Sequence, residues 1–335
     1  MESFYFLGID MAKNTFQAAL TLDGINMFET EIENKSKTIR AYFTELKNKF
    51  QFSSSQLIVC LEHTGIYSYP LLDYLVKAGV KVCVEPALQI KQSQGMKRGK
   101  SDKVDARRIA QYAVKNLPAL KFWKPQRSTI QKIQALLVVR DRLVKMKVQL
   151  ETPLNETQEF IEESLRKMLA KNCQTTLAAL KKDLLKIEHV IKSLIKSDPQ
   201  VEQQFKWATS VPGIGPITAL NVIVASGEFE RISESKKFAC YAGVAPFEHM
   251  SGTSVRGKTR VSKMANMTVK KMLHLAAISA IQCSPELKAY YQRKVAEGKN
   301  RMSVINAVRN KLITRVFVCI KNKRMYEKVY QNALA

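Results

Sequence analysis

Histidine is scarce in this 335-residue sequence, and paired cysteines are absent. The four histidines show no metal-ligand spacing, and the six cysteines stand singly with no CxxC pair. This pattern argues against a zinc site and against a disulfide framework. The cysteines lie in apolar stretches such as LIVCLE and KVCVEP, which favours reduced core residues and a cytoplasmic location.

Long apolar runs and glycine-rich phosphate loops are also missing. No run reaches the roughly 18 apolar residues that a membrane span needs. The first residues, MESFYFLGIDMAK, lack a basic region and are interrupted by Asp10, so we expect neither a signal peptide nor a membrane partner. The GID near the N-terminus also occurs in sugar-kinase and actin-like ATPases, but that fold needs phosphate loops, and this chain offers only HTG.

Acidic residues are few relative to basic ones. The chain has 54 Lys and Arg against 29 Asp and Glu, a net charge of +25 and a pI near 9.8. From Arg256 to Lys328 there are 18 basic and 3 acidic residues, a local net charge of +15. Because this charge is clustered, we interpret it as a surface for nucleic-acid phosphates rather than for an anionic membrane.

The first part of the chain, residues 1–118, reads as an α/β domain. Apolar runs predict strands at 3–9, 15–22, 56–61 and 80–84. Asp23-Gly24 is expected to be a hairpin turn that leads from 15–22 into a further strand, NMFETEIEN at 26–34. Amphipathic patterns predict helices at 36–50, 67–78 and 101–116. Strands interleaved with helices indicate an α/β layer.

The middle segment, residues 119–204, is predicted to be helical, and residues 205–330 to form a mostly α domain. Spacings of 3, 4, 3, 4 and 3 give a coiled-coil seam at Leu177, Leu180, Leu184, Ile187, Ile191 and Leu194. Two long helices are expected to join near Lys171–Asn172. They form either an antiparallel hairpin within the chain or a zipper between chains, and the sequence favours neither.

Four carboxylates stand where strands end or a helix begins. Asp10 and Glu62 follow apolar strands, and Asp102 and Asp105 lie one turn apart in KSDKVDARRIA. Acids at neighbouring strand ends, with two more on a helix, can converge on one edge of a sheet. Such hard oxygen ligands hold Mg²⁺ or Mn²⁺ and support phosphodiester cleavage.

Each of these acids also has an ordinary structural explanation. Asp10 would serve as a strand-end turn residue, Glu62 as a solvated acid, Asp102 as a helix N-cap, and Asp105 as a partner of an adjacent arginine. Taken together in this order, they favour a metal site. Basic residues around the two aspartates are candidates for phosphate binding: Lys97, Arg98, Lys100, Arg107 and Arg108.

The C-terminal part carries two further candidate segments. SVPGIGPITA places Gly213 and Gly215 in a helix-hairpin-helix-like turn, where backbone N–H groups can hold a phosphate. ACYAGVAPFEHMSGTSVRGKTRVSK predicts a flexible loop that faces phosphate and contains Ser251 and Ser254. His249 is better explained as a loop or phosphate contact than as a proton-transfer group. The basic residues of this loop are Arg256, Lys258, Arg260 and Lys263.

GIDMAKNTF, EHTGIYSYPL and KSDKVDARRIA resemble the three motif blocks of the DEDD insertion-sequence transposases, which include the Piv/MooV-type invertases. The resemblance implies a RuvC-like N-terminal domain with an RNase H fold. It makes Asp10, Glu62, Asp102 and Asp105 the catalytic tetrad. One departure is Glu85 in VEPALQIK, where the family pattern has Asn; this second acid is an alternative ligand, but the order and context of the motifs favour Glu62.

The block YAGVAPFEHMSGTSVRGK, with VPGIGPITA before it, resembles the C-terminal transposase domain of the same family. This implies a serine nucleophile, with Ser251 as first choice and Ser254 as second, working with the tetrad of a partner subunit in a dimer or tetramer. The family also implies a guide (bridge) RNA from the element itself. The resemblance covers residues 4–115 and about 205–290.

The sequence therefore predicts a transposase or site-specific recombinase that cuts and rejoins DNA. Two alternatives stay open. A RuvC-type resolvase or hydrolytic nuclease would use the tetrad alone, and a non-enzymatic nucleic-acid-binding protein would use neither tetrad nor serine.

Overall fold

The computed structural model describes residues 4–93, 102–156, 160–251, 255–262 and 264–327. The chain divides into two compact units, Met1–Pro125 and Gln126–Ala335, which are described separately. Within the described ranges, no helix is both long and apolar enough to span a membrane.

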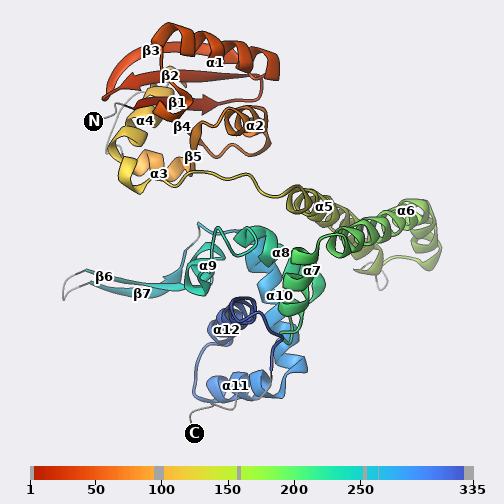
Figure 1. Ribbon diagram of the computed structural model, residues 1–335. Coiled ribbons are helices and arrows are strands. Elements are labelled where there is room, and N and C mark those ends of the chain that lie inside the picture. Colours follow the sequence, from red (N-terminus) through yellow and green to blue (C-terminus); the bar gives the residue numbers. More distant parts are fainter. Residues whose placement is uncertain (1–3, 94–101, 157–159, 252–254, 263, 328–335) are drawn as a thin grey trace. The chain divides into compact units, whose positions relative to one another are not determined.

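The first unit is built on a five-stranded mixed sheet (Figure 1). Its strands are β1 (Tyr5–Met11), β2 (Thr15–Leu22), β3 (Ile25–Glu33), β4 (Leu57–Glu62) and β5 (Lys81–Glu85), in the order β3-β2-β1-β4-β5. The first three strands are antiparallel, and β4 and β5 run parallel to β1. Asp23 and Gly24 have φ values of 49° and 85°, as a two-residue I′ turn requires, so the predicted hairpin is confirmed.

Helices cover both faces of this sheet. One face packs its alternating apolar residues against α1 (Ser36–Phe50) and α2 (Tyr69–Lys77). The other face packs against α3 (Ala87–Gln92) and α4 (Asp102–Lys115). Short 3-10 turns lie at Ser54–Gln56, Gly65–Ser68 and Leu117–Ala119. The predicted α/β layer is confirmed, and α3 is an element that the sequence patterns did not predict.

The second unit begins with two long helices, α5 (Ser128–Glu156) and α6 (Glu163–Lys196), that pack on each other. Arg140 pairs with Glu188 at 2.9 Å and Lys181 with Glu151 at 3.3 Å, so the two helices run antiparallel within one chain. The expected join near Lys171–Asn172 is wrong. That stretch has no glycine or proline to interrupt the helix, and the chain reverses between α5 and α6 instead.

The rest of the second unit packs around a single apolar core. Its helices are α7 (Pro199–Thr209), α8 (Pro216–Ser226), α9 (Ser235–Tyr241), α10 (Met267–Cys283), α11 (Pro285–Ala296) and α12 (Arg301–Lys321). The segment expected to be a flexible loop contains a two-stranded hairpin, β6 (Pro246–Ser251) and β7 (Val255–Val261). The β-branched residues Val255, Thr259 and Val261 alternate along β7, and this favours a strand.

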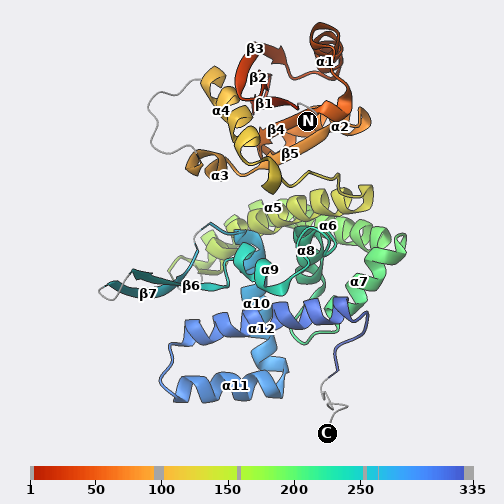
Figure 2. The ribbon, with the colours of Figure 1, turned by 60° about the vertical axis from the view of Figure 1, so that its left-hand side comes forward.

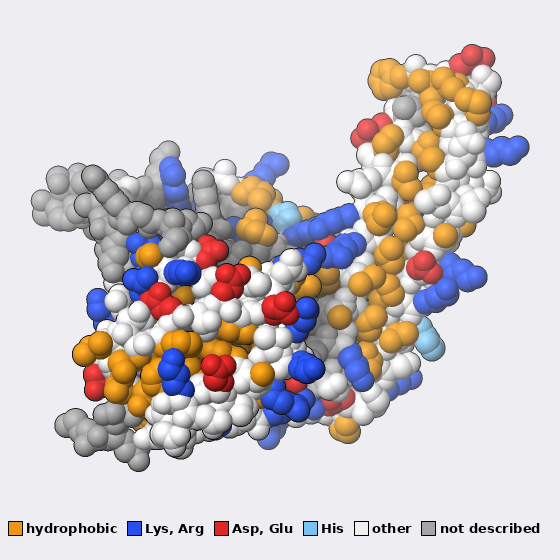
Figure 3. All heavy atoms as spheres, turned by 90° about the horizontal axis from the view of Figure 1, so that it is seen from above, with side chains coloured by type: hydrophobic (Ala, Val, Ile, Leu, Met, Phe, Trp, Pro, Cys, Tyr) orange, Lys and Arg blue, Asp and Glu red, His pale blue; other side chains and the backbone are white. Residues whose placement is uncertain are grey.

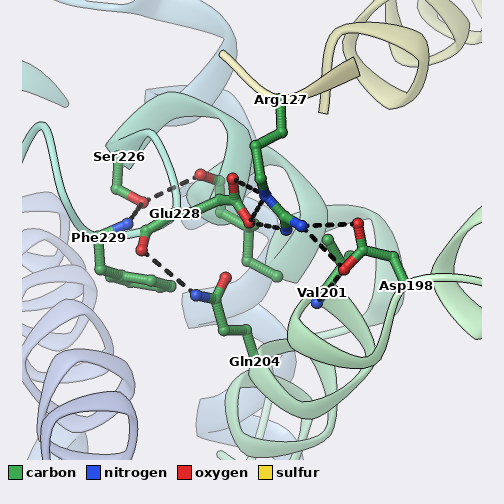
Figure 4. A network of polar contacts seen from close by, with 8 residues as sticks. Arg127, Asp198, Val201, Gln204, Ser226, Glu228 and Phe229 are labelled. Carbon is green, nitrogen blue, oxygen red and sulfur yellow. Dashed lines mark hydrogen bonds and ion pairs between the residues drawn. The ribbon is translucent and has the colours of Figure 1, made fainter. Parts of the chain in front are cut away.

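Arg127, just before α5, ties three segments of the second unit together (Figure 4). Its Nη1 donates to the Asp198 carboxylate at 2.9 Å, and its Nε donates to Glu228 at 2.9 Å. Both carboxylates are about nine-tenths buried. Burial alone would raise the pKa of Asp198, but hydrogen bonds from the Val201 amide and other donors, Arg127 among them, lower it overall.

We predict that Arg127→Met lowers the free energy of unfolding of the second unit by about 2–3 kcal/mol near neutral pH. This is below the about 3–5 kcal/mol of a fully buried pair, because the Arg127 side chain is 41% exposed. The lowered pKa of Asp198 stabilises the fold above the ordinary aspartate pKa of about 4, and this contribution is lost as pH falls through the lowered value. The difference between wild type and variant should therefore shrink below about pH 4.

Urea denaturation in a Trp123→Phe background, with Trp207 as the reporter of the second unit, measures this effect. Arg140→Met is the matched control, because Arg140 pairs with one partly exposed carboxylate and should cost less than about 1 kcal/mol. An equal loss in both variants, or no pH dependence, would contradict the assigned role of Arg127.

Candidate active site and nucleic-acid interface

Three acids line up where parallel strands β1, β4 and β5 end. Ile9 of β1 pairs with Leu61 of β4, so the register carries Asp10 next to Glu62. Glu62 in turn pairs with Glu85 of β5. Ile9 and Leu61 pack into the core under α1 and α2, so their neighbours Asp10 and Glu62 belong to the opposite face, where α4 lies. The strand register thus sets Asp10, Glu62 and Glu85 on neighbouring strand ends.

Helix α4 packs closely against β1 at Gly8 (Figure 2). A Cβ on Gly8 would meet the Ala106 carbonyl oxygen at 2.1 Å and the Ala110 nitrogen at 2.3 Å. Farther along, Ile109 and Ala113 of α4 share a core with Phe6 of β1. The helix thus runs opposite to β1, and its first turn, with Asp102 and Asp105, lies toward the end of the strand that carries Asp10.

Basic side chains of α4 pair with acids in this arrangement. Arg108 Nη1 lies 2.9 Å from Asp105 Oδ1, and Arg107 pairs with Glu29 on β3. Asp102 is exposed. Within the described part of the chain, no three His, Cys, Asp or Glu side chains converge closely enough to hold a metal ion as they stand. The carboxylate oxygens of these acids suit a hard divalent cation. Because Asp105 is paired with Arg108, this ion pair would have to open before Asp105 could bind the metal.

Beneath the row of acids lies a buried pair of thiols, Cys60 on β4 and Cys83 on β5. The Cys83 Sγ donates to Glu85 Oε1 at 3.2 Å, and Glu85 is 8% exposed. The hydrogen bond with Cys83, together with burial, raises the pKa of the Cys60 thiol well above its usual range. These cysteines are packed thiols, and one of them holds the buried Glu85 carboxylate in place.

The two glycines of the VPGIG turn have different surroundings. Gly213 has a φ of 86°, and a Cβ there would meet the Ala280 Cβ at 2.4 Å, so this glycine allows close packing on α10. Gly215 begins α8 and has open space around it. Of the two, only Gly215 has a surrounding that leaves room for a phosphate.

Ser251 is the last residue of β6 and pairs with Val255, at the end of the β6–β7 hairpin. Arg256, Lys258 and Arg260 lie on β7, and Arg260 is exposed. Several predicted residues lie outside the described part of the chain: Lys97, Arg98, Lys100, Ser254 and Lys263.

Two family models match the chain. Residues 7–161 match a model described as "Transposase", of the DEDD type, and residues 206–292 match the "Transposase IS116/IS110/IS902 family". The chain belongs to this transposase family. It is therefore a DNA recombinase enzyme, and a family of this carboxylate type implies divalent-metal use in general.

Curated relatives are similar to this transposase over nearly its whole length. The pilin gene-inverting protein of Moraxella bovis is 27% identical over 334 residues, covering 96% of this chain and 98% of the relative. The transposase for insertion sequence element IS1111A of Coxiella burnetii is 25% identical, covering 92% of this chain and 88% of the relative. Among solved structures, Thermus thermophilus RuvC matches 36% of this chain and 100% of its own, at 16% identity and a TM-score of 0.28.

We predict that Gly8→Ala lowers the free energy of unfolding of the first unit by about 1–3 kcal/mol, because α4 must move away from β1. Urea denaturation in a Trp207→Phe background measures it, since Trp123 packs against the core of the first unit. Lys37→Ala, on the exposed side of α1, should stay within about 0.5 kcal/mol of wild type. An unchanged stability of Gly8→Ala would show that the close approach of α4 is wrong.

Proposed function

We propose that this transposase cuts and rejoins DNA through a covalent ester on Ser251, assisted by Mg²⁺ or Mn²⁺ held by Asp10, Glu62, Asp102 and Asp105. The backbone arrangement supports this proposal. The register of β1 with β4 sets Asp10 beside Glu62, and the direction of α4 across Gly8 turns its first turn, with Asp102 and Asp105, toward the same end of β1. A non-enzymatic protein would have no need for such a set of like charges.

The chemistry has two steps at one phosphorus atom. The Ser251 hydroxyl loses its proton and its oxygen attacks the phosphodiester, while the departing DNA oxygen leaves and gains a proton. The hydroxyl of a second DNA end then attacks the phosphoserine, which restores the serine. When bound, the metal supplies charge stabilisation for the phosphate oxygens. The four carboxylates would hold and orient the metal. With Asp105 bound to the ion, the Arg108 guanidinium would be available to bind a DNA phosphate.

Basic residues near each site would hold the DNA backbone. Arg107 and Arg108 adjoin the carboxylate edge, and Arg256, Lys258 and Arg260 follow Ser251 along the hairpin. The names of the relatives point to two outcomes, gene inversion and transposition of an insertion sequence. The same pair of steps produces either outcome. An element-encoded guide RNA is part of the proposal through the family resemblance, and the net charge of +25 suits both nucleic acids.

A homo-oligomer is also part of the proposal. Hydrophobic side chains follow one side of the α5–α6 hairpin, at the right of Figure 3. Exposed hydrophobic residues on the two helices include Met146 on α5 and Leu185 on α6, which are 53% and 68% exposed. Such a stripe on a helical hairpin favours pairing with another subunit.

Trapping the covalent intermediate tests the mechanism. Labelled junction DNA, the element RNA, Mg²⁺ and the full-length chain are combined, and the products are separated on a denaturing gel. We predict that label remains on the wild-type protein, and that Ser251→Ala and Asp102→Asn each lose it by at least about 100-fold.

Ser279→Ala, an exposed serine on α10, is the control and should keep the label. Loss of the label in Ser254→Ala with retention in Ser251→Ala would move the nucleophile to the second serine. Cut DNA without any label on the protein, unaffected by either serine change, would mean hydrolysis of the RuvC type and would refute the serine mechanism.

A further inference from the structure

Arg309 on α12 is a buried cation without a counter-charge. It is 7% exposed, and no carboxylate of the described residues lies within ion-pair distance. Its Nη1 donates to Asn306 Oδ1 at 3.4 Å, its Nη2 contacts His274 Nδ1 on α10, and its Nε has no partner. By contrast, Arg315 on the same helix pairs with Glu286 at 2.5 Å.

An isolated buried charge is unfavourable because it loses its hydration, and arginine cannot avoid this by losing its proton. Burial lowers the pKa of Arg309. Among the described residues, this permanent positive charge has only neutral partners. A negative group from outside the chain would compensate it.

The contact with Arg309 also determines how His274 is protonated. A guanidinium only donates hydrogen bonds, so His274 Nδ1 must accept, and the proton of the neutral ring sits on Nε2. Burial, and then the charge of Arg309, lower the pKa of His274, which agrees with a neutral ring. His274 is partly exposed, so its Nε2–H can serve as a donor for a ligand.

The same cluster supports the base of the serine hairpin. Asn306 Nδ2 donates to the Val244 carbonyl at 2.8 Å, two residues before β6 begins. Lys270, one turn before His274 on α10, is partly buried, and its Nζ lies 3.5 Å from where a Cβ on Gly243 would stand. Lys270 and Asn306 thus lie against the segment that leads to Ser251, and Asn306 connects this segment to Arg309, which contacts His274.

We propose that Lys270, His274 and Arg309 form a binding site for a backbone phosphate of DNA, which positions the strand beside the β6–β7 hairpin. The site rests on the proposed role of that hairpin in strand exchange, but it binds through charge and needs no metal. Arg309 lies beyond the residues that either family model matches.

The test measures binding of the full-length chain to a fluorescent DNA duplex over a series of salt concentrations, with a chelator present so that no cleavage occurs. Each phosphate contact made by a cation contributes about 0.9 to the slope of log K against log salt. We predict that Arg309→Gln and Lys270→Gln each reduce this slope by about one and weaken binding roughly tenfold at low salt. His274→Phe should weaken binding a few-fold without changing the slope, because the neutral ring carries no charge.

Arg315→Gln is the matched control, since its charge is already paired with Glu286, and its slope should equal that of wild type. Thermal melting shows whether each variant folds. If Arg309→Gln fails to fold, Lys270→Gln and the His274→Phe comparison still decide the outcome.

A wild-type slope in folded Arg309→Gln and Lys270→Gln would overturn the site. So would equal slope changes in Arg309→Gln and Arg315→Gln. Because the chelator removes the chemistry, failure of the serine or carboxylate mechanism would leave this result unchanged, and the two proposals fail independently.

Discussion

The contact of the α4 backbone with β1 at Gly8 is the constraint on which the site depends. Two acids come from strand ends and two from the first turn of this helix, so the separation of helix and strand decides whether they can share an ion. Gly8 lies between Phe6 and Asp10 on one face of β1, and Ala106 and Ala110 face it. Small residues on both sides permit an approach that any larger side chain would prevent.

Much of the first unit could be predicted because its signals are local. Alternating apolar residues set the strands, and Asp23-Gly24 supplies the two positive φ values of its turn. The amphipathic pattern gave helix 36–50 with the bounds that α1 has. The placement of Asp10 and Glu62 at one edge followed from parallel strands ending together.

Other features depend on contacts between distant residues and could not be predicted in this way. The α6 helix continues through Lys171–Asn172 because nothing there interrupts it, whereas the coiled-coil seam alone suggested a break. The β6–β7 hairpin is short and polar, so its strands gave little apolar periodicity. The burial of Arg309 could be predicted only weakly, because it adjoins the apolar series Val304, Val308, Leu312 and Val316. Its contact with His274 could not be predicted, since the two residues are 35 positions apart.

We propose that one edge of the sheet and the first turn of α4 form a single metal site. Electron paramagnetic resonance of Mn²⁺ titrated into the full-length chain without DNA tests this directly. If they share one ion, Asp10→Asn, Glu62→Gln and Asp105→Asn should each weaken Mn²⁺ binding at least about tenfold. Glu29→Gln, on the same sheet but paired with Arg107, should bind as wild type does. Binding that is insensitive to Asp10 and Glu62, or that is lost only with Glu85→Gln, would contradict it.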